Sequence, residues 1–137
     1  MNIMELSDIN FWAVLVGTVA SFLLGFLWYG PLFGKPWQKH VGLSDEDLKS
    51  ANMGLIFGPA IVLTFIMGLV LASILPVYAN WLDGMLLGAV LGLGVAAASL
   101  GINYLFARRT MTLFMIDGLY IVFVMMIFGA IIGAWHV

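Results

Sequence analysis

The chain has 137 residues, of which 64% are hydrophobic and only 9% are charged. A soluble domain has about 25% charged residues, so this composition excludes a soluble fold and indicates that the lipid bilayer is the solvent of the protein. The net charge of -2, with five basic residues, argues against nucleic acid as a partner, and the absence of cysteine excludes disulfides and thiolate chemistry.

The N-terminal residues 1–10 contain Glu5 and Asp8 but no Lys or Arg. A secretory signal peptide begins with a basic region, which this segment lacks. We therefore expect the first hydrophobic segment to remain in the mature protein.

Four continuously apolar runs follow in chain order, at residues 11–33, 52–75, 84–106 and 113–135. A helix of this length measures roughly 35 Å, which is enough to cross a hydrocarbon core of about 30 Å. The runs do not alternate between polar and apolar residues, which excludes the strands of a membrane barrel. The sequence thus predicts an all-α fold, a single polytopic domain over residues 1–137 with four transmembrane helices.

The connection 34–51 is the longest one and carries a helix signal of its own. Ser44 is followed directly by three acidic residues, a pattern typical of a helix N-terminus. We expect a short interfacial helix here, which either anchors the connection to lipid headgroups or offers a docking surface to a partner. Pro31 is expected to end the first transmembrane helix, and Pro59 is expected to kink the second.

The basic residues fix the expected orientation in the membrane. All five lie in two of the three connections: Lys35, Lys39, Lys49, Arg108 and Arg109. Loops rich in Lys and Arg face the cytoplasm. The connections 34–51 and 107–112 are therefore predicted to be cytoplasmic, with both termini on the outer side.

The two halves of the sequence resemble each other. The second run aligns without gaps on the fourth, where Ile56, Gly58, Ile61 and Val62 match Ile116, Gly118, Ile121 and Val122. The ends of the first and third runs also align, and this pairs Tyr29 with Tyr104. Two duplicated helix hairpins would explain the match, and so would chance, because apolar sequences match easily.

Small residues recur at a spacing of four in every run. They are Gly17, Ser21 and Gly25, then Gly54 and Gly58, then Gly84, Gly88 and Gly92, and finally Gly129 and Gly133. Helix association in lipid depends on the close packing that such residues allow. Some of these faces are expected to pack within the chain, and a small-residue face on every helix leaves a surplus for a homo-oligomer.

Polar side chains in and beside the spans gather toward the predicted cytoplasmic side. The candidate binding residues are Asp117, Tyr120, Asn103, Arg108, Arg109, Trp28, Tyr29 and Asn52. Asp117 is the single acid within a span, and Tyr120 follows it on the same helix face. A carboxylate roughly 7 Å deep needs a partner. Either Asp117 forms a structural ion pair with Arg108 or Arg109, or it has a proton-, ion- or headgroup-linked role; Asn103 is interpreted as an interhelical hydrogen-bonding residue.

Catalytic and metal chemistry find little support. The two histidines, His40 and His136, are predicted on opposite sides of the membrane and cannot share a metal ion. No Ser–His–acid set and no pair of carboxylates can be assembled at one depth. We therefore expect no catalytic residues, no metal and no cofactor.

Three segments carry a resemblance to a known family: WYGPLFGKPW at 28–37, NYLFARR at 103–109 and GAIIGAW at 129–135. With them the chain resembles, over nearly its whole length, a bacterial family of small membrane proteins catalogued as domain of unknown function 1761. The resemblance implies an inner-membrane location and supplies no mechanism. Family members often carry an acid where this chain has Ala107 and a histidine where it has Ile121, which weakens the case for a shared proton-handling site.

Together these observations predict a small integral inner-membrane protein that self-associates as a structural or accessory component and has no enzymatic activity. Its expected partners are membrane lipids, further copies of the chain and, in the accessory role, another membrane protein. The alternative is an oligomeric channel or transporter for an ion, a small solute or a lipid, with Asp117 in its pathway.

Overall fold

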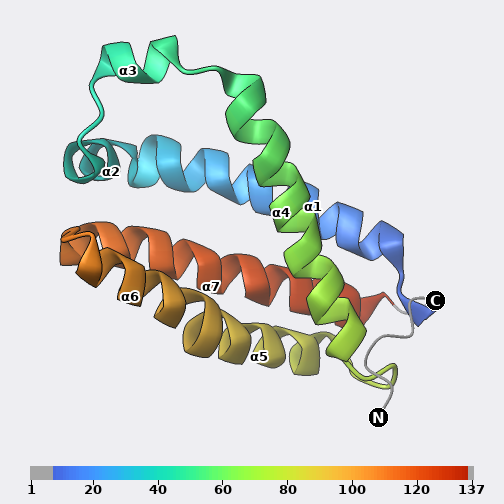
Figure 1. Ribbon diagram of the computed structural model, residues 1–137. Coiled ribbons are helices and arrows are strands. Elements are labelled where there is room, and N and C mark those ends of the chain that lie inside the picture. The colour runs from blue at the N-terminus through green and yellow to red at the C-terminus, as the bar shows by residue number, and fades with distance from the viewer. Residues whose placement is uncertain (1–7, 136–137) are drawn as a thin grey trace.

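The computed structural model describes residues 8–135, and within this range the chain is helical without a strand. Figure 1 shows the long helices of the chain and a short pair, α2 and α3, at one end. In chain order the elements are α1 (Phe11–Leu27), the π-helical segment η2 (Trp28–Leu32), α2 (Gly34–Val41), α3 (Asp45–Ser50), α4 (Met53–Ile74), α5 (Trp81–Leu91), the π-helical segment η3 (Gly92–Ala97), α6 (Ala98–Phe106) and α7 (Met111–Ala134).

Four helical stretches of the described chain are long and apolar enough to cross a membrane: Phe11–Leu32, Met53–Ile74, Trp81–Phe106 and Met111–Ala134. They confirm the predicted fold class of four transmembrane helices. The largest difference in their ends is at the third span, which begins at Trp81 instead of Gly84. The helix starts before the apolar run because Asn80 caps it, with its side-chain oxygen accepting from the Asp83 backbone N–H at 3.0 Å.

A polar side chain caps the start of every span. Each cap accepts hydrogen bonds from backbone N–H groups of the first turn, which have no helical carbonyl as a partner. The four caps are Asn10, Asn52, Asn80 and Thr110. The helix starts are therefore set by single polar residues at the edges of the apolar runs.

Helix α7 is central, with α1 on one side and the α5–α6 span on the other (Figure 1). Phe128 of α7 is fully buried and belongs to a core that joins α1, α4 and α7. A Cβ atom on Gly17 of α1 would lie 2.5 Å from the Phe128 ring, and one on Gly68 of α4 would lie 2.4 Å from it. These two glycines make room for the ring.

Helices α5 and α7 pack backbone against backbone. A Cβ atom on Gly84 would lie 1.9 Å from the carbonyl oxygen of Gly129, and one on Gly88 would lie 2.1 Å from that of Met125. Near the end of α7, a Cβ atom on Gly133 would lie 2.3 Å from the Asn80 carbonyl oxygen. The small-residue faces of these two helices are thus used within the chain.

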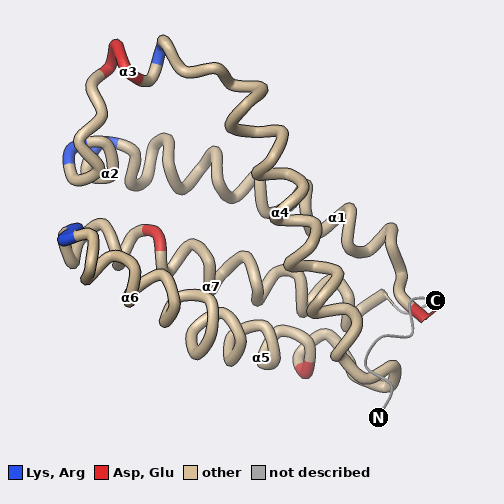
Figure 2. Tube along the Cα trace, in the orientation of Figure 1, with Lys and Arg blue, Asp and Glu red and all other residues tan. Residues whose placement is uncertain are grey.

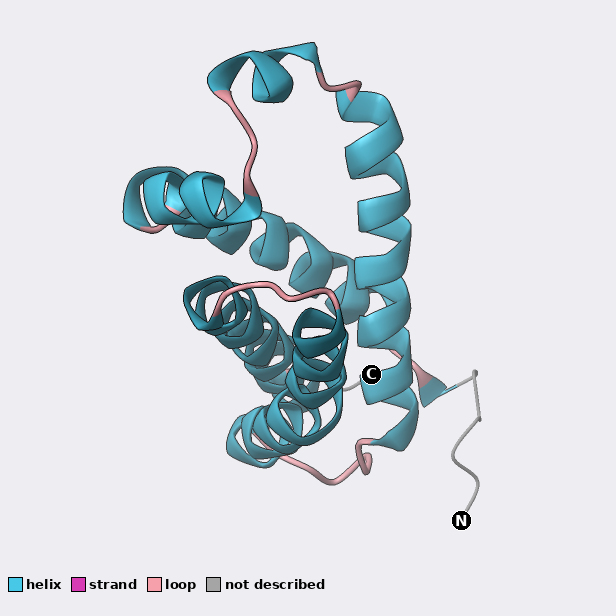
Figure 3. Cartoon of the chain, turned by 60° about the vertical axis from the view of Figure 1, so that its left-hand side comes forward, coloured by secondary structure: helices cyan, strands magenta, loops and turns pink. Residues whose placement is uncertain are grey.

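The first half of α4 is packed very differently. The buried residues of this helix are Gly68 and Leu71, both in its second half. Apart from its chain neighbours and the backbone of its own helix, no described residue comes within 4 Å of a Cβ position on Gly58, and Gly54 has just the side chain of its own cap, Asn52, nearby. Figure 3 shows this half of α4 standing away from the other long helices.

Pro31 does not end the first helix. It lies inside the π-helical segment η2, and α2 follows after a single residue, Phe33. The wider turn tolerates a residue without an N–H, since the Phe33 N–H donates five residues back, to the Trp28 carbonyl at 2.8 Å. Helix α4 continues through Pro59, and the predicted kink there stays a prediction.

The connection 34–51 holds two short helices instead of the single one expected. The predicted start at Ser44 is confirmed: its hydroxyl accepts from the Asp47 N–H at 3.1 Å, and its own N–H donates to the Asp47 carboxylate at 2.9 Å. The hydrogen bond from the Ser44 backbone lowers the pKa of Asp47. The additional helix, α2, ends at Val41 and is followed by Gly42, whose φ of 81° suits a residue without a side chain.

The basic residues of the described chain lie at one end of the bundle, whereas acids occur at both ends. Figure 2 shows Lys and Arg at the end where α2, α3 and the turn between α6 and α7 lie, whereas the start of α5 at the opposite end carries an acid. The two hairpins differ in packing, because α1 and α4 diverge toward α3 while α5, α6 and α7 stay together (Figures 1 and 3). Their common origin by duplication stays a prediction.

Candidate functional site

Asp117 lies in the second turn of α7 and is half-buried. The Tyr29 hydroxyl donates to one oxygen of its carboxylate at 2.6 Å. The Tyr104 hydroxyl donates to the other oxygen. Three elements, η2, α6 and α7, therefore meet at a single carboxylate, which is held by two neutral donors.

The expected ion pair between Asp117 and an arginine is not formed. Within residues 8–135 the partners of the Asp117 side chain are the two tyrosines. Arg108 takes up a left-handed conformation, with φ at 57°, that closes the turn between α6 and α7. The side chain of Arg109 turns toward α2 instead, where its Nη1 donates to the Val41 carbonyl at 3.3 Å.

Tyr120 and Trp28 pack around this carboxylate without bonding to it. The Tyr120 hydroxyl donates to the Ser21 carbonyl of α1 at 2.8 Å, and its ring stands edge-on to that of Tyr29 at 5.1 Å. The Trp28 indole N–H donates to the Ile116 carbonyl at 3.0 Å. Both residues fix the position of η2 against α7, and so they fix where the Tyr29 hydroxyl lies.

Two of the predicted site residues lie elsewhere. Asn52 caps α4, where its side chain accepts from the Leu55 N–H at 3.3 Å. Asn103 is exposed, and its side chain makes no hydrogen bond within the described chain, so the interhelical role expected for it is wrong inside the monomer. The structure thus brings Asp117, Tyr29, Tyr120 and Trp28 together and leaves both asparagines out.

Tyr104 is the site residue that the sequence prediction missed. A signal for it was present, because the alignment of the two halves pairs Tyr29 with Tyr104, and these are the two side chains that bind Asp117. The orientation of Tyr104 toward α7 depends on the close α6–α7 packing, which the alignment alone does not reveal.

A second set of contacts joins α2 to the turn between α6 and α7. His40 Nδ1 and the Thr110 hydroxyl are 2.8 Å apart, beside the bond from Arg109 to Val41. Across residues 8–135, no three His, Cys, Asp or Glu side chains come together in a way that would hold a metal ion. His136, which was expected on the outer side, lies outside the described residues.

The chain matches the family described as a protein of unknown function (DUF1761) over residues 12–133. No curated protein matches the chain, and no solved structure does either. The matched range covers the four spans except for the first residue, Phe11, and the last, Ala134, and it includes the whole of the Asp117 site. The protein therefore belongs to the DUF1761 family, as its sequence motifs indicated.

Proposed function

We propose that this member of the DUF1761 family is a self-associating structural or accessory component of the bacterial inner membrane, without chemistry of its own. Four apolar helices make it a multi-pass membrane protein. The proposal rests above all on the surface of α4. Membrane lipids and a second membrane protein are further expected partners of the protein.

The first half of α4 is the small-residue face that the chain leaves open. The faces on α5 and α7 contact each other directly, and Gly17 of α1 receives Phe128. On α4, Gly54 and Gly58 form a small-residue pair four apart, flanked by exposed Leu55 and Val62. Helices in lipid associate through close packing at small residues like these, because the hydrophobic effect does not favour a neighbouring helix over lipid tails.

The orientation proposed for the assembly follows from the charges. The cation-bearing connections 34–51 and 107–112 lie at one end of the bundle (Figure 2). The positive-inside rule places this end in the cytoplasm and both termini outside. Reactivity of single cysteines introduced at Lys49 and at Tyr78 toward an impermeant reagent tests this orientation, since just the Tyr78 position should react in intact spheroplasts.

Native mass spectrometry of the protein in lipid nanodiscs prepared from its own membrane tests self-association. We expect a defined homo-oligomer for the natural sequence and monomers for Gly54→Leu. Gly54 is preferred to Gly58, because a Cβ atom at position 58 would meet the ring of the following Pro59.

Gly94→Leu in η3 is the matched control, since a Cβ atom there also meets no described residue within 4 Å. This variant should keep the oligomer. A monomer for the natural sequence contradicts self-association, and an equal loss in both variants contradicts an α4 interface.

A conduit for an ion, a small solute or a lipid is the second candidate, and the environment of Asp117 favours it. An acid within a span that no cation neutralises is costly in a purely structural role. Two tyrosine hydroxyls can stabilise the carboxylate and can also rearrange when its charge changes. Because four helices enclose little room, such a path would lie between subunits.

Proton flux into proteoliposomes, followed with a pH-sensitive dye trapped inside, tests this second candidate. Asp117→Asn should abolish the flux, and Glu46→Gln on the exposed α3 makes the same charge change away from the site. A flux that persists in Asp117→Asn contradicts a path through this carboxylate. If the natural protein carries neither protons nor Na⁺ nor K⁺, the ion-conduit candidate is rejected.

A further inference from the structure

A cavity of about 250 Å³ lies between α6 and α7. Most of its lining is apolar: Ala98, Gly101, Ile102, Leu105, Met111 and Phe114. The ring of Phe114 covers Gly101, where a Cβ atom would lie 3.0 Å from it. Its volume is below the range of roughly 300–1,000 Å³ that is usual for drug-sized ligands, so a slender group suits it better than a bulky ring.

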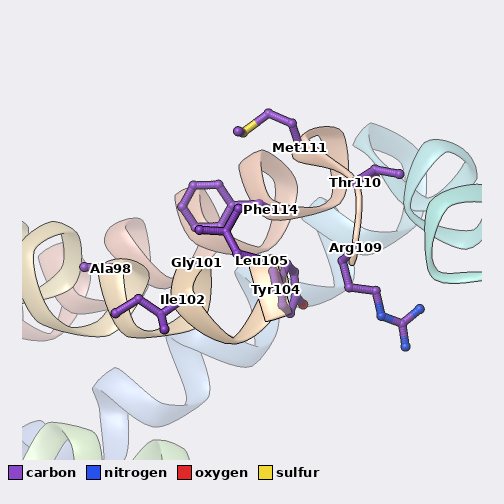
Figure 4. Close-up of a pocket in the computed structure, with 9 residues that line it drawn as sticks. All are labelled: Ala98, Gly101, Ile102, Tyr104, Leu105, Arg109, Thr110, Met111 and Phe114. Atoms are coloured by element: carbon purple, nitrogen blue, oxygen red, sulfur yellow. The ribbon is translucent and has the colours of Figure 1, made fainter. Parts of the chain in front are cut away.

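The lining residues of the cavity are spread along α6, which runs across the membrane in the proposed orientation. Figure 4 shows Ala98 and Ile102 at one end of the lining residues and Arg109 and Thr110 at the other. From Ala98 to the end of α6 at Phe106 the helix rises by about 12 Å, which is most of one leaflet of hydrocarbon, about 15 Å thick. Leu105 at the rim is exposed, so a lipid chain has lateral access.

The polar end of the cavity is basic. Arg109 lines it, and Figure 4 shows its side chain extending away from the apolar lining. One of its donors is used by the Val41 carbonyl, which fixes the side chain and leaves other guanidinium N–H groups available. The contact between His40 and Thr110 holds the end of α2 against the same turn, and α2 contains two lysines and no acid.

Three acids of this end of the molecule belong to α3, which Figures 2 and 3 place away from the turn between α6 and α7. A fourth acid, Asp117, lies next to the cavity, and its carboxylate accepts from the hydroxyl of Tyr104, which lines the cavity. The charged side chain in the lining itself is Arg109, at the depth where the headgroups of the cytoplasmic leaflet lie in the proposed orientation. Basic pockets between transmembrane helices at that depth favour anionic headgroups.

We propose that the cavity between α6 and α7 binds one anionic phospholipid, with an acyl chain along Ala98, Ile102 and Leu105 and its phosphate at Arg109. The site lies on a different helix pair from the α4 surface. It therefore does not depend on self-association, and its test involves no change at Asp117.

The test is a lipid titration of the purified protein in mild detergent, followed by native mass spectrometry. Palmitoyl-oleoyl phosphatidylglycerol and palmitoyl-oleoyl phosphatidylcholine have the same chains and differ in headgroup charge. We expect the first bound lipid to bind about tenfold more tightly when it is phosphatidylglycerol, which corresponds to one charge-assisted hydrogen bond.

Two variants separate the headgroup from the chain. Arg109→Gln should remove the preference for phosphatidylglycerol, and Lys49→Gln on α3 should keep it although it removes the same charge. Ala98→Phe, which fills the far end of the cavity, should weaken the binding of both lipids about tenfold. Circular dichroism verifies that each variant keeps its helix content.

Several results would overturn the proposal. They are equal affinities for the two lipids, an equal loss in Arg109→Gln and Lys49→Gln, and unchanged binding by Ala98→Phe. Inorganic phosphate added at the concentration of the lipid should not displace the lipid. Displacement by phosphate would show a free-anion site at Arg109 in place of a lipid site.

Discussion

The α5–α7 pair and the first half of α4 have the same kind of sequence and opposite surroundings. Both are apolar and both carry glycines four residues apart, yet Gly84 and Gly129 touch backbone to backbone while a Cβ atom on Gly58 would meet no other described helix. The difference lies in the connections. A tight turn joins α6 to α7, with the Arg109 N–H donating to the Tyr104 carbonyl at 2.9 Å, whereas α1 and α4 are separated by two short helices. A small-residue motif therefore indicates that another helix can pack closely against it. The rest of the chain determines which helix does so.

The largest effect should follow from filling the α5–α7 contact. In Gly129→Ala the new methyl group would lie 1.8 Å from the Gly84 carbonyl oxygen, so the two helices must move apart. We expect a loss of about 3 kcal/mol in the free energy of unfolding, at the upper end of the usual cost of overpacking. Thermal unfolding in bicelles, followed by circular dichroism, measures it.

Gly54→Ala is the matched control when both variants are unfolded as monomers, because its methyl group has room within the chain. Its stability should stay the same or rise by up to about 1 kcal/mol, since alanine favours a helix more than glycine does. Equal losses in the two variants would break the comparison between the two regions.

A smaller effect on stability should distinguish the second half of α4 from the first. In Gly68→Ala the methyl group would lie 2.4 Å from the Phe128 ring, a side chain that can shift slightly where a backbone cannot. We expect a loss of about 1 kcal/mol, measured in the same way. If Gly68→Ala is as stable as Gly54→Ala, then the second half of α4 is packed no more closely than the first.

An effect of similar size but confined to one short helix is expected in the segment that leads into α4. Ser44→Ala removes the cap of α3, and backbone amides of α3 should exchange with deuterium about fivefold faster, as for a cap worth about 1 kcal/mol. The α5–α7 amides should be unchanged, because α3 does not pack on them. Slower exchange in α3 would contradict the capping role.

Acidification should have a similar effect on α3 in the natural protein. The pKa of Asp47 is lowered by its bond to the Ser44 backbone, so the folded form favours the carboxylate. That contribution is present above the ordinary carboxyl pKa, about 4, and is lost as the pH falls through the lowered pKa of Asp47. Ser44→Ala should show a smaller change over this pH range.

The sequence predicted part of the candidate site. Asp117 stood out as the single acid in a span, and Tyr29 and Trp28 were placed near it by depth alone. Of the two roles left open for Asp117, the ion pair with an arginine is not formed, because closeness along the chain does not fix the direction of a side chain. Arg109 turns to the Val41 carbonyl, and Tyr104 fills the place beside Asp117.

The sequence by itself determined the four spans, since the bilayer requires long apolar helices and polar residues mark their ends. It also determined the helix start at Ser44 and the membership in the DUF1761 family, both of which depend on local patterns. The tertiary structure alone decided which glycines pack together, which hydroxyls reach Asp117 and where the cavity between α6 and α7 forms. In lipid every apolar face is equally satisfied by acyl chains, so hydropathy does not select a partner, and the choice is left to shape and to the geometry of the connections.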